Sequence, residues 1–224
     1  MGRQSGSGHP AITVDVVAFT LLEDDLQALL IRSQAPPSKG RWAIPSARIR
    51  DGEPLETTAR CILEGYGAQD MYLEQLCAFG NAWRDPRGRA VAVAYLALVT
   101  ATSATPAGGD ASDVRWWSIY KLPPLALDHA QILDFALQRL RNKLEYTAVG
   151  FRLLPPAFTL TETQRAYEVV LGSPLDKRNF RRRILEAGII GETRQRGGSR
   201  GRPARLYRLR DDAMIETKAR RLFP

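Results

Sequence analysis

The chain has 224 residues, of which 44% are hydrophobic and 25% are charged, and its formal net charge at pH 7 is +8. This length accommodates one medium-sized domain and one small domain, and the charge is uneven, since residues 151–224 carry +9 and residues 1–150 carry −1. The sequence has no run of about 18 apolar residues, which excludes a membrane span, and it has 2 cysteines, which excludes a disulfide framework.

The start of the chain and its cysteines indicate the compartment. Residues 1–10 lack the apolar stretch of a signal peptide, so we expect them to form a disordered leader. Cys61 and Cys77 fit a reducing environment. We therefore expect a protein of the cytoplasm.

The first 150 residues predict strands interrupted by two amphipathic helices. Segments rich in β-branched and aromatic residues give the expected strands 12–22, 27–32, 73–83, 90–100 and 114–118. The apolar residues of 53–66 recur at helical spacing, and Pro54 suits the first turn of that helix. A second helix is expected over about 128–146, and the Ala, Thr, Gly and Ser residues of 100–113 predict a mobile loop.

Within this order, the first predicted helix carries part of a known motif. The Nudix box reads G-x5-E-x7-R-E-U-x-E-E-x-G-U, where U is apolar, and the chain matches it at Arg60, Glu64 and Gly67. Two strands, a loop and a helix with this spacing resemble the Nudix hydrolase fold, an α/β/α sandwich with a mixed sheet. The three metal-binding glutamates of the box would fall on Cys61, Glu64 and Gly65, so one carboxylate remains.

The missing carboxylates argue against hydrolysis. In a Nudix enzyme Mg²⁺ neutralises the pyrophosphate and helps to activate water, and carboxylates hold this hard cation. A thiol is a poor ligand for it, and glycine offers no side chain. We therefore expect no catalytic residue, no metal site and no enzyme activity, with Glu64 a solvated carboxylate or a partner of Arg60. An active pyrophosphatase for ADP-ribose or a nucleotide sugar is the alternative.

An arginine cluster indicates that this domain binds a ligand. Residues 79–89 place three arginines around a tight Asp-Pro-Arg-Gly turn. Guanidinium groups bind phosphate in bidentate fashion, so the cluster could hold a diphosphate without metal, although an exposed hairpin tip would carry the same residues. The tryptophans at 42, 83, 116 and 117 offer flat faces for an adenine ring, or belong to the core. The candidate ligand-binding residues are Arg48, Arg84, Asp85, Arg87, Arg89, Trp117 and His129.

The last third of the chain follows a stiff junction and holds the excess positive charge. Pro155 and Pro156 stop a helix, so we expect domains at 11–150 and 151–224. Ten of the basic residues lie within 177–205. Such asymmetry indicates an anionic partner such as nucleic acid, and a solvated basic face is the alternative.

Two helices are expected after the junction. The sequence Thr-Leu-Thr-Glu from Thr159 has the spacing of a capping box, which opens a helix to about residue 171. After a Gly-Ser-Pro turn, Ser173 or Asp176 can cap a second helix that runs to about residue 187 and closes at Gly188.

The second of these helices has one apolar side and one basic side. At 100° per residue, Phe180 and Ile184 point to the core. Arg178, Asn179 and Arg182 point the other way, where arginine suits guanine and asparagine suits adenine in the major groove of DNA. A contact between two copies of the chain is the alternative use of this face, but its charges make that costly.

A cationic hairpin completes a winged helix-turn-helix. Residues 191–196 and 204–210 are expected to pair as strands around the glycine-rich loop 197–203, whose arginines could reach the minor groove or the backbone. The candidate DNA-binding residues are Lys177, Arg178, Asn179, Arg181, Arg182, Arg183, Arg194, Arg196, Arg200, Arg202 and Arg205.

The motifs together resemble the Nudix-related transcriptional regulators of NAD metabolism, the NrtR group. The residues that carry the resemblance are 175–185, Gly-Arg-Pro-Ala-Arg-Leu-Tyr at 201–207, and Arg-Asp-Pro-Arg-Gly-Arg at 84–89 behind a degenerate Nudix box. The resemblance implies a homodimeric repressor of NAD genes, acting on DNA in the nucleoid without a cofactor. It also implies a palindromic double-stranded operator and release by ADP-ribose or a related nucleotide. Relatives of that group respond to sugars, which leaves a sugar effector as an alternative.

Overall fold

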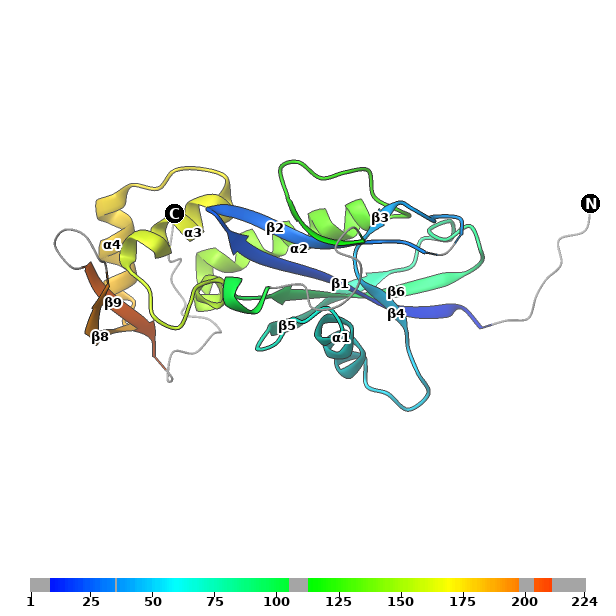
Figure 1. Cartoon of the computed structure of the whole chain (residues 1–224), viewed down its shortest axis with the longest axis horizontal. Coiled ribbons are helices and arrows are strands. Elements are labelled where there is room, and N and C mark those ends of the chain that lie inside the picture. Colours follow the sequence, from blue (N-terminus) through cyan, green and yellow to red (C-terminus); the bar gives the residue numbers. More distant parts are fainter. Residues whose placement is uncertain (1–8, 35, 105–112, 198–203, 211–224) are drawn as a thin grey trace, which may run out of the picture.

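The structure, a computed structural model, describes residues 9–34, 36–104, 113–197 and 204–210, with the backbone alone at 194–197. Its first part contains β1 (Ala11–Leu22), β2 (Asp25–Arg32), β3 (Trp42–Ala43), β4 (Ser46–Arg48), α1 (Leu55–Glu64), β5 (Tyr72–Phe79), β6 (Ala90–Leu98), η1 (Ala101–Ser103), β7 (Val114–Ser118) and α2 (His129–Tyr146). Its second part contains η2 (Ala148–Leu153), α3 (Leu160–Leu171), α4 (Lys177–Glu186), β8 (Ile190–Gly197) and β9 (Ala204–Leu209). The two parts lie end to end (Figure 1).

Three expected loops fall wholly or partly outside the described residues. These are positions 1–8 of the predicted leader, 105–112 of the predicted mobile loop and 198–203 of the predicted wing loop.

The first part is built on one mixed sheet. The strand order is β3-β2-β1-β6-β5, with β4 also paired to β1 and β7 paired to β2. β1 runs parallel to β6, and the other pairs are antiparallel. The long strand β1 is therefore central, and its residues reach both faces of the sheet.

Helices cover both faces of this sheet, as the α/β/α prediction requires (Figure 1). Alternate residues of β1 point to opposite sides, since Val17 and Phe19 share one buried cluster with α2, whereas Val16 and Ala18 share another with α1. Burial of these two apolar faces holds the sandwich together.

Some predicted boundaries differ from the observed ones because local turn chemistry intervenes. α1 begins at Leu55, and Pro54 occupies the N-cap with an extended backbone instead of the first helical turn. β5 ends at Phe79 rather than residue 83, because Asn81 accepts hydrogen bonds from the backbone of Trp83 and Arg84 and closes a turn there. α2 begins at His129, one residue after the expected start.

The second part has the predicted helix-turn-helix and hairpin. Thr159 and Glu162 form the capping box at the start of α3, and Gly172 ends that helix in the left-handed conformation, with φ of 73°. Of the two predicted caps for α4, Asp176 is the one used, since its carboxylate accepts from the backbone of Asn179 at 2.7 Å. β8 and β9 pair antiparallel.

The turn η2 joins the two parts tightly, and the sequence did not predict it. Val149 and Phe151 of η2 are buried in the same cluster as Leu140 of α2 and Tyr167 of α3. Gly150 lies so close to its neighbours that an added Cβ would stand 2.5 Å from a methyl group of Leu144. One apolar core therefore continues from the sheet into the second part.

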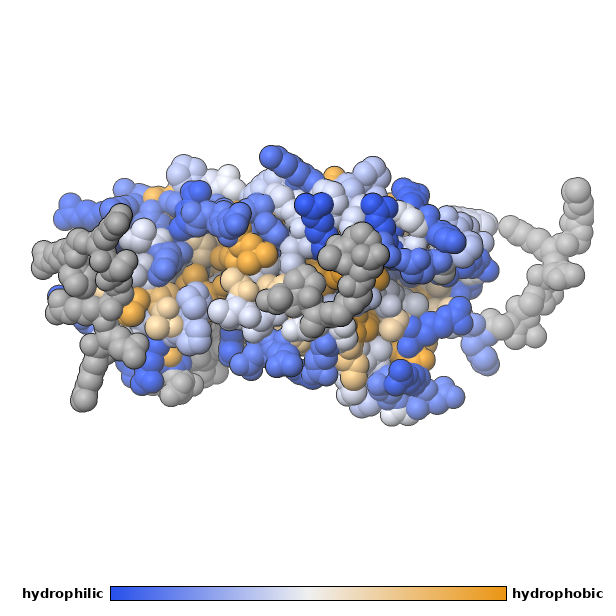
Figure 2. Space-filling view, in the orientation of Figure 1, coloured by the Kyte–Doolittle hydropathy of each residue, from blue (hydrophilic) through white to orange (hydrophobic). Residues whose placement is uncertain are grey.

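Hydrophobic side chains also gather on the surface where the sheet meets α3 (Figure 2). A hollow there is lined by Leu21, Leu153, Leu154, Ala166 and Val169, among others. Within the described residues, no helix is long and apolar enough to cross a membrane.

Candidate functional site

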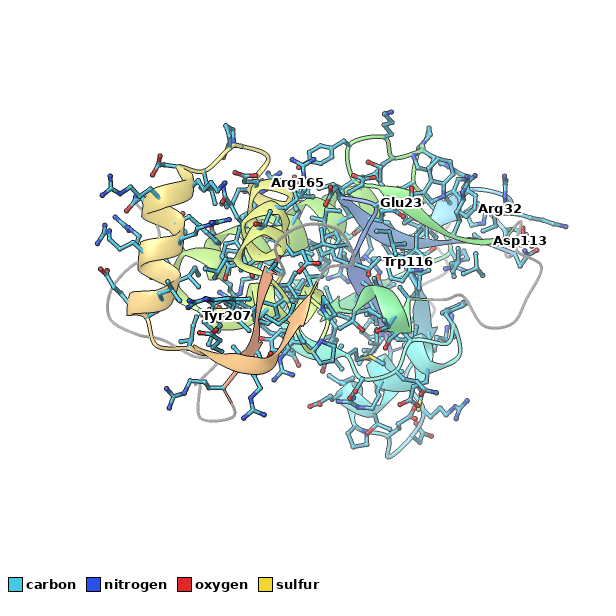
Figure 3. All side chains as sticks on the ribbon, turned by 60° about the vertical axis from the view of Figure 1, so that its left-hand side comes forward. Glu23, Arg32, Asp113, Trp116, Arg165 and Tyr207 are labelled. Carbon is cyan, nitrogen blue, oxygen red and sulfur yellow. The ribbon has the colours of Figure 1, made fainter. Side chains whose placement is uncertain are left out.

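A cavity of about 510 Å³ opens at the end of the sheet farthest from α4. Its walls come from the N-terminal half of β1, from β4, from the turns at 33–38 and 84–87, and from the start of α2. Its charged and titratable lining residues are Asp15, Arg32, Arg48, Tyr66, Arg84, Asp85, Arg87, Asp113 and His129. Figure 3 labels Arg32 and Asp113 at this end of the molecule.

Arg84 is the buried centre of the cavity wall. Its guanidinium donates to Asp128 at 2.9 Å through two nitrogens and to Asp15 at 3.0 Å, and its side chain is 3% exposed. Ser46 donates to the other oxygen of Asp15. A buried charge needs such pairing, so the predicted phosphate-binding Arg84 is already bound to two carboxylates.

His129 contributes a neutral ring to the same wall. Its Nδ1 accepts from the backbone N–H of Ile44 at 3.1 Å, and its Nε2 lies 3.9 Å from Asp15. Burial lowers the pKa of His129, against the opposing effects of Asp15 and Asp128. The neutral ring therefore presents Nε2–H as a donor on the cavity side.

Of the remaining predicted arginines, Arg48 and Arg87 line the cavity and Arg89 does not. Arg87 is bound through several hydrogen bonds to Asp85, which lower the pKa of that carboxyl. Arg89 donates to the carbonyl of Gly80 at 2.7 Å and does not line the cavity. Arg48 lines it, is exposed, and has no ion pair with any described residue. Arg48 is thus the most available cation for an anionic ligand.

Trp117 lies elsewhere. Its ring packs against Trp42, with the ring centroids 5.3 Å apart, and Arg115 covers it. Neither Trp117 nor Trp42 lines the cavity. The structure therefore does not bring this predicted residue together with the arginines.

The Nudix box positions do not form a cation site. Cys61, Glu64 and Gly65 are exposed on α1, and Arg60 pairs with Glu56 at 3.2 Å instead of with Glu64. In the described part of the chain, no three His, Cys, Asp or Glu side chains come together in a way that could hold a metal ion. The residues present do not fit the Mg²⁺ of a Nudix hydrolase.

A second candidate site lies at the opposite end, on α4. Phe180 and Ile184 are 2% and 0% exposed and fix the helix to the core. Figure 3 shows nitrogen-tipped side chains projecting from its outer face. Lys177, Arg178 and Arg182 are exposed there. The face that the sequence predicts to enter the major groove is therefore exposed to solvent.

Hydrogen bonds order the basic side chains of α4. The Asn179 carboxamide oxygen accepts from Arg182 at 2.8 Å and from Arg183 at 3.2 Å. Arg182 also binds the Glu186 carboxylate at 3.1 Å, and Arg181 donates to Thr161 of α3 at 2.9 Å. The side chains that the sequence predicts to read bases are thus partly fixed by contacts within the chain.

The hairpin carries the other predicted DNA contacts. Arg205 pairs with Glu192 across the two strands at 3.3 Å. Arg194 and Arg196 lie on β8, but their side chains are outside the described residues, as are Arg200 and Arg202 altogether.

The sequence did not predict Asp15 and Arg32, which line the cavity, or Asp128, which holds Arg84 in its wall. Asp15 and Asp128 are 69 and 44 residues from Arg84 in the chain. A signal for Asp15 was present, because a carboxylate inside an apolar strand needs a buried partner.

Two domain families match the chain. The NUDIX domain family matches residues 11–135, and the NrtR DNA-binding winged helix domain family matches residues 150–209. Over 211 residues, which are 92% of this chain and 84% of the relative, the chain is 40% identical to the ADPR responsive transcriptional repressor NtrR of Acinetobacter baylyi.

Two solved structures from Shewanella oneidensis are similar to this chain. NrtR complexed with a 27mer DNA superposes with a TM-score of 0.84 at 37% identity, covering 94% of this chain and 98% of that one. The NUDIX domain of NrtR complexed with ADP ribose superposes with a TM-score of 0.53 at 34% identity, covering 62% of this chain and 94% of that one.

Proposed function

Because this chain belongs to the NUDIX family and carries the winged helix domain of its NrtR members, we propose that it is a DNA-binding transcriptional repressor that responds to a nucleotide. One observation carries the proposal: a single chain joins a cation-rimmed cavity at one end to an exposed basic helix on a rigid core at the other. We assign residues 11–150 to the ligand-binding domain and 151–224 to the DNA-binding domain.

The proposed effector is ADP-ribose or a related nucleotide. Arg48 and Arg87 lie on the cavity rim, where guanidinium groups can bind a diphosphate. His129 offers a neutral donor within the same cavity. The similar domain from Shewanella oneidensis was crystallised with ADP ribose, which supports this ligand class.

The domain binds this nucleotide without cleaving it. Two of the three glutamate positions of the Nudix box are Cys61 and Gly65, so the carboxylates that would hold Mg²⁺ on the diphosphate are missing. No catalytic residue, resident metal or cofactor is assigned.

The DNA partner is a double-stranded operator read by α4 and the hairpin. A homodimer of this chain would present two such units to the half-sites of a palindrome. The proposed targets are genes of NAD synthesis or salvage, and the effector releases the repressor from them. Release requires the effector to favour a domain arrangement that fits the operator poorly.

A shift assay with a duplex selected by the protein from a random library tests the DNA-binding face. Arg178→Ala and Arg182→Ala should each weaken specific binding about tenfold at fixed salt, because each loses a base contact. Arg165→Ala is the matched control, since Arg165 is an exposed arginine of α3 that pairs with Asp24 instead of facing outward from α4. Equal binding by all three variants would show that α4 does not read DNA.

ADP-ribose tests the rest of the proposal in the same assay. Adding it to the wild-type protein should release the duplex, and incubation with Mg²⁺ should leave the nucleotide intact. Efficient formation of AMP, lost in Glu64→Gln, would instead identify an enzyme.

A further inference from the structure

Trp83 is the most exposed large hydrophobic side chain in the described part of the chain. It is 80% exposed, against 54% for Tyr120 and 48% for Leu185, which follow it. Tryptophan is normally buried to a large extent, because its apolar surface is the largest of any residue. An indole left almost entirely in water is therefore a candidate contact for a partner or a ligand.

The backbone holds Trp83 outward rigidly. The N–H of Trp83 donates to the Asn81 carboxamide at 3.0 Å, and the N–H of Arg84 donates to the Asn81 carbonyl at 3.2 Å. The next side chain, Arg84, is bound to Asp15 and Asp128 in the core. Hydrogen bonds to Asn81 and the ion pairs of Arg84 thus hold the backbone on both sides of the exposed Trp83.

Trp83 borders a second hollow that is a neighbour of the nucleotide cavity. This hollow, of about 620 Å³, shares Pro37, Ser38, Arg84 and Leu127 with the cavity described above. The first hollow carries Arg48 and Arg87, and the indole of Trp83 borders the second.

The second hollow offers hydrogen-bonding groups beside the ring. Asn81 and Gln131 are exposed and line it, so that their carboxamides are available to the polar edge of a base. Arg41 also lines it, with one guanidinium nitrogen bound to the carbonyl of Leu125 at 2.9 Å. The flat face of the indole and the carboxamides of Asn81 and Gln131 suit a heteroaromatic base.

We propose that Trp83 is the base-binding platform of the effector site. The two neighbouring hollows would together take a ligand in which an aromatic base is joined through phosphates to a second polar group, with the base stacked on Trp83 and the phosphates near Arg48 and Arg87. The proposal rests on the nucleotide-responsive function given above and names the residue that selects for a base. Stacking of the base on the Trp83 indole explains why this ring is exposed, since the base would cover the apolar surface that the fold leaves in water.

Calorimetry on the full chain tests the platform with two ligands. Trp83→Ala should weaken the binding of ADP-ribose about tenfold, because it removes one stacking contact, and Trp83→Phe should keep most of it. Ribose 5-phosphate, which has no base, should bind all three proteins equally. Tyr146→Ala, which removes another exposed aromatic ring at the far end of α2, is the matched control and should bind ADP-ribose as the wild type does.

Fluorescence and light scattering separate the possible failures. AMP should quench the Trp83 emission of the wild type, and the quenching should be absent in Trp83→Phe. Unchanged ADP-ribose affinity in Trp83→Ala overturns the proposal, and loss of self-association in that variant would show that Trp83 contacts a second copy instead. If AMP binds through Trp83 but ADP-ribose does not bind, Trp83 still binds a base and ADP-ribose is not the effector. If neither nucleotide binds, both the role of Trp83 and the nucleotide effector are refuted.

Discussion

The guanidinium of Arg84 lies between two carboxylates from distant parts of the chain, Asp15 of β1 and the N-cap residue Asp128 of α2. The sequence places this arginine in a cluster with Arg87 and Arg89, where all three look alike as phosphate ligands. Their environments differ, because Arg84 is buried and the other two are exposed. Arg84 therefore organises the cavity wall, and of the other two arginines only Arg87 lines the cavity.

Replacing Arg84 tests this structural role. Arg84→Met should lower the free energy of unfolding by about 3–5 kcal/mol, because it leaves the buried Asp15 carboxylate without its positively charged partner. Urea denaturation followed by circular dichroism measures the change. Arg89→Met is the control and should change stability by less than about 1 kcal/mol, since Arg89 is exposed and makes one hydrogen bond to Gly80. A stable Arg84→Met protein would contradict the network.

At the scale of elements, the junction between the two parts depends on packing at η2. The backbone of Gly150 fits between Leu144 of α2 and Tyr167 of α3, both of which are fully buried. This turn therefore fixes α2 and α3 relative to each other by close packing.

A methyl group at the junction should be costly. Gly150→Ala would place a Cβ 2.5 Å from Leu144 and 3.0 Å from the Tyr167 ring, and such overpacking should lower the unfolding free energy by about 1–3 kcal/mol. Thermal and urea denaturation measure the loss. In Gly191→Ala, the control, the nearest atom belongs to Arg210 at 3.8 Å, and stability should hardly change. Equal stability of both variants would mean that the junction is loosely packed.

The elements that the sequence predicts are those with local signals. α3 has its capping box, α4 its aspartate cap and its apolar pair, and α2 its long periodic stripe, so all three occur where expected. η2 has a threonine cap, Thr147, but only six residues, too few to show a helical period in the sequence. The pairing of Arg84 with Asp15 and Asp128, and the exposure of Trp83, depend on residues brought together by the fold.

At the scale of the whole molecule, α2 connects the two sites. Its 18 residues span about 27 Å. At its N-terminal end His129 lines the cavity and the N-cap residue Asp128 binds Arg84, and near its other end Arg141 donates to the carbonyl of Val170 in α3 at 2.8 Å. Tyr120 donates to the neighbouring carbonyl of Val169 at 2.7 Å. The last turn of α3 is thereby bound to the NUDIX domain.

Removing the hydrogen bond from Arg141 to Val170 should reduce the effect of ADP-ribose on operator affinity. In Arg141→Met, the ratio of operator affinities without and with ADP-ribose should fall about fivefold or more, because the winged helix no longer follows α2. The affinity for ADP-ribose alone should stay the same. Both quantities come from titrations of a labelled duplex and of the nucleotide.

Arg139→Met provides the matched control for that coupling experiment. Arg139 is an exposed arginine of the same helix that pairs with Glu74 of β5 and does not face α3. Its replacement should leave the ratio unchanged. A normal ratio in Arg141→Met would exclude this contact as the route of communication.

The uneven burial of charge has a consequence for the effect of salt. The Arg84 network is shielded from solvent, so dissolved ions screen it little, whereas the guanidinium groups of α4 stand in water and would meet phosphates in competition with counterions. A higher salt concentration should therefore weaken DNA binding while leaving the wall of the cavity intact. A repressor built in this way would respond to ionic strength as well as to its ligand.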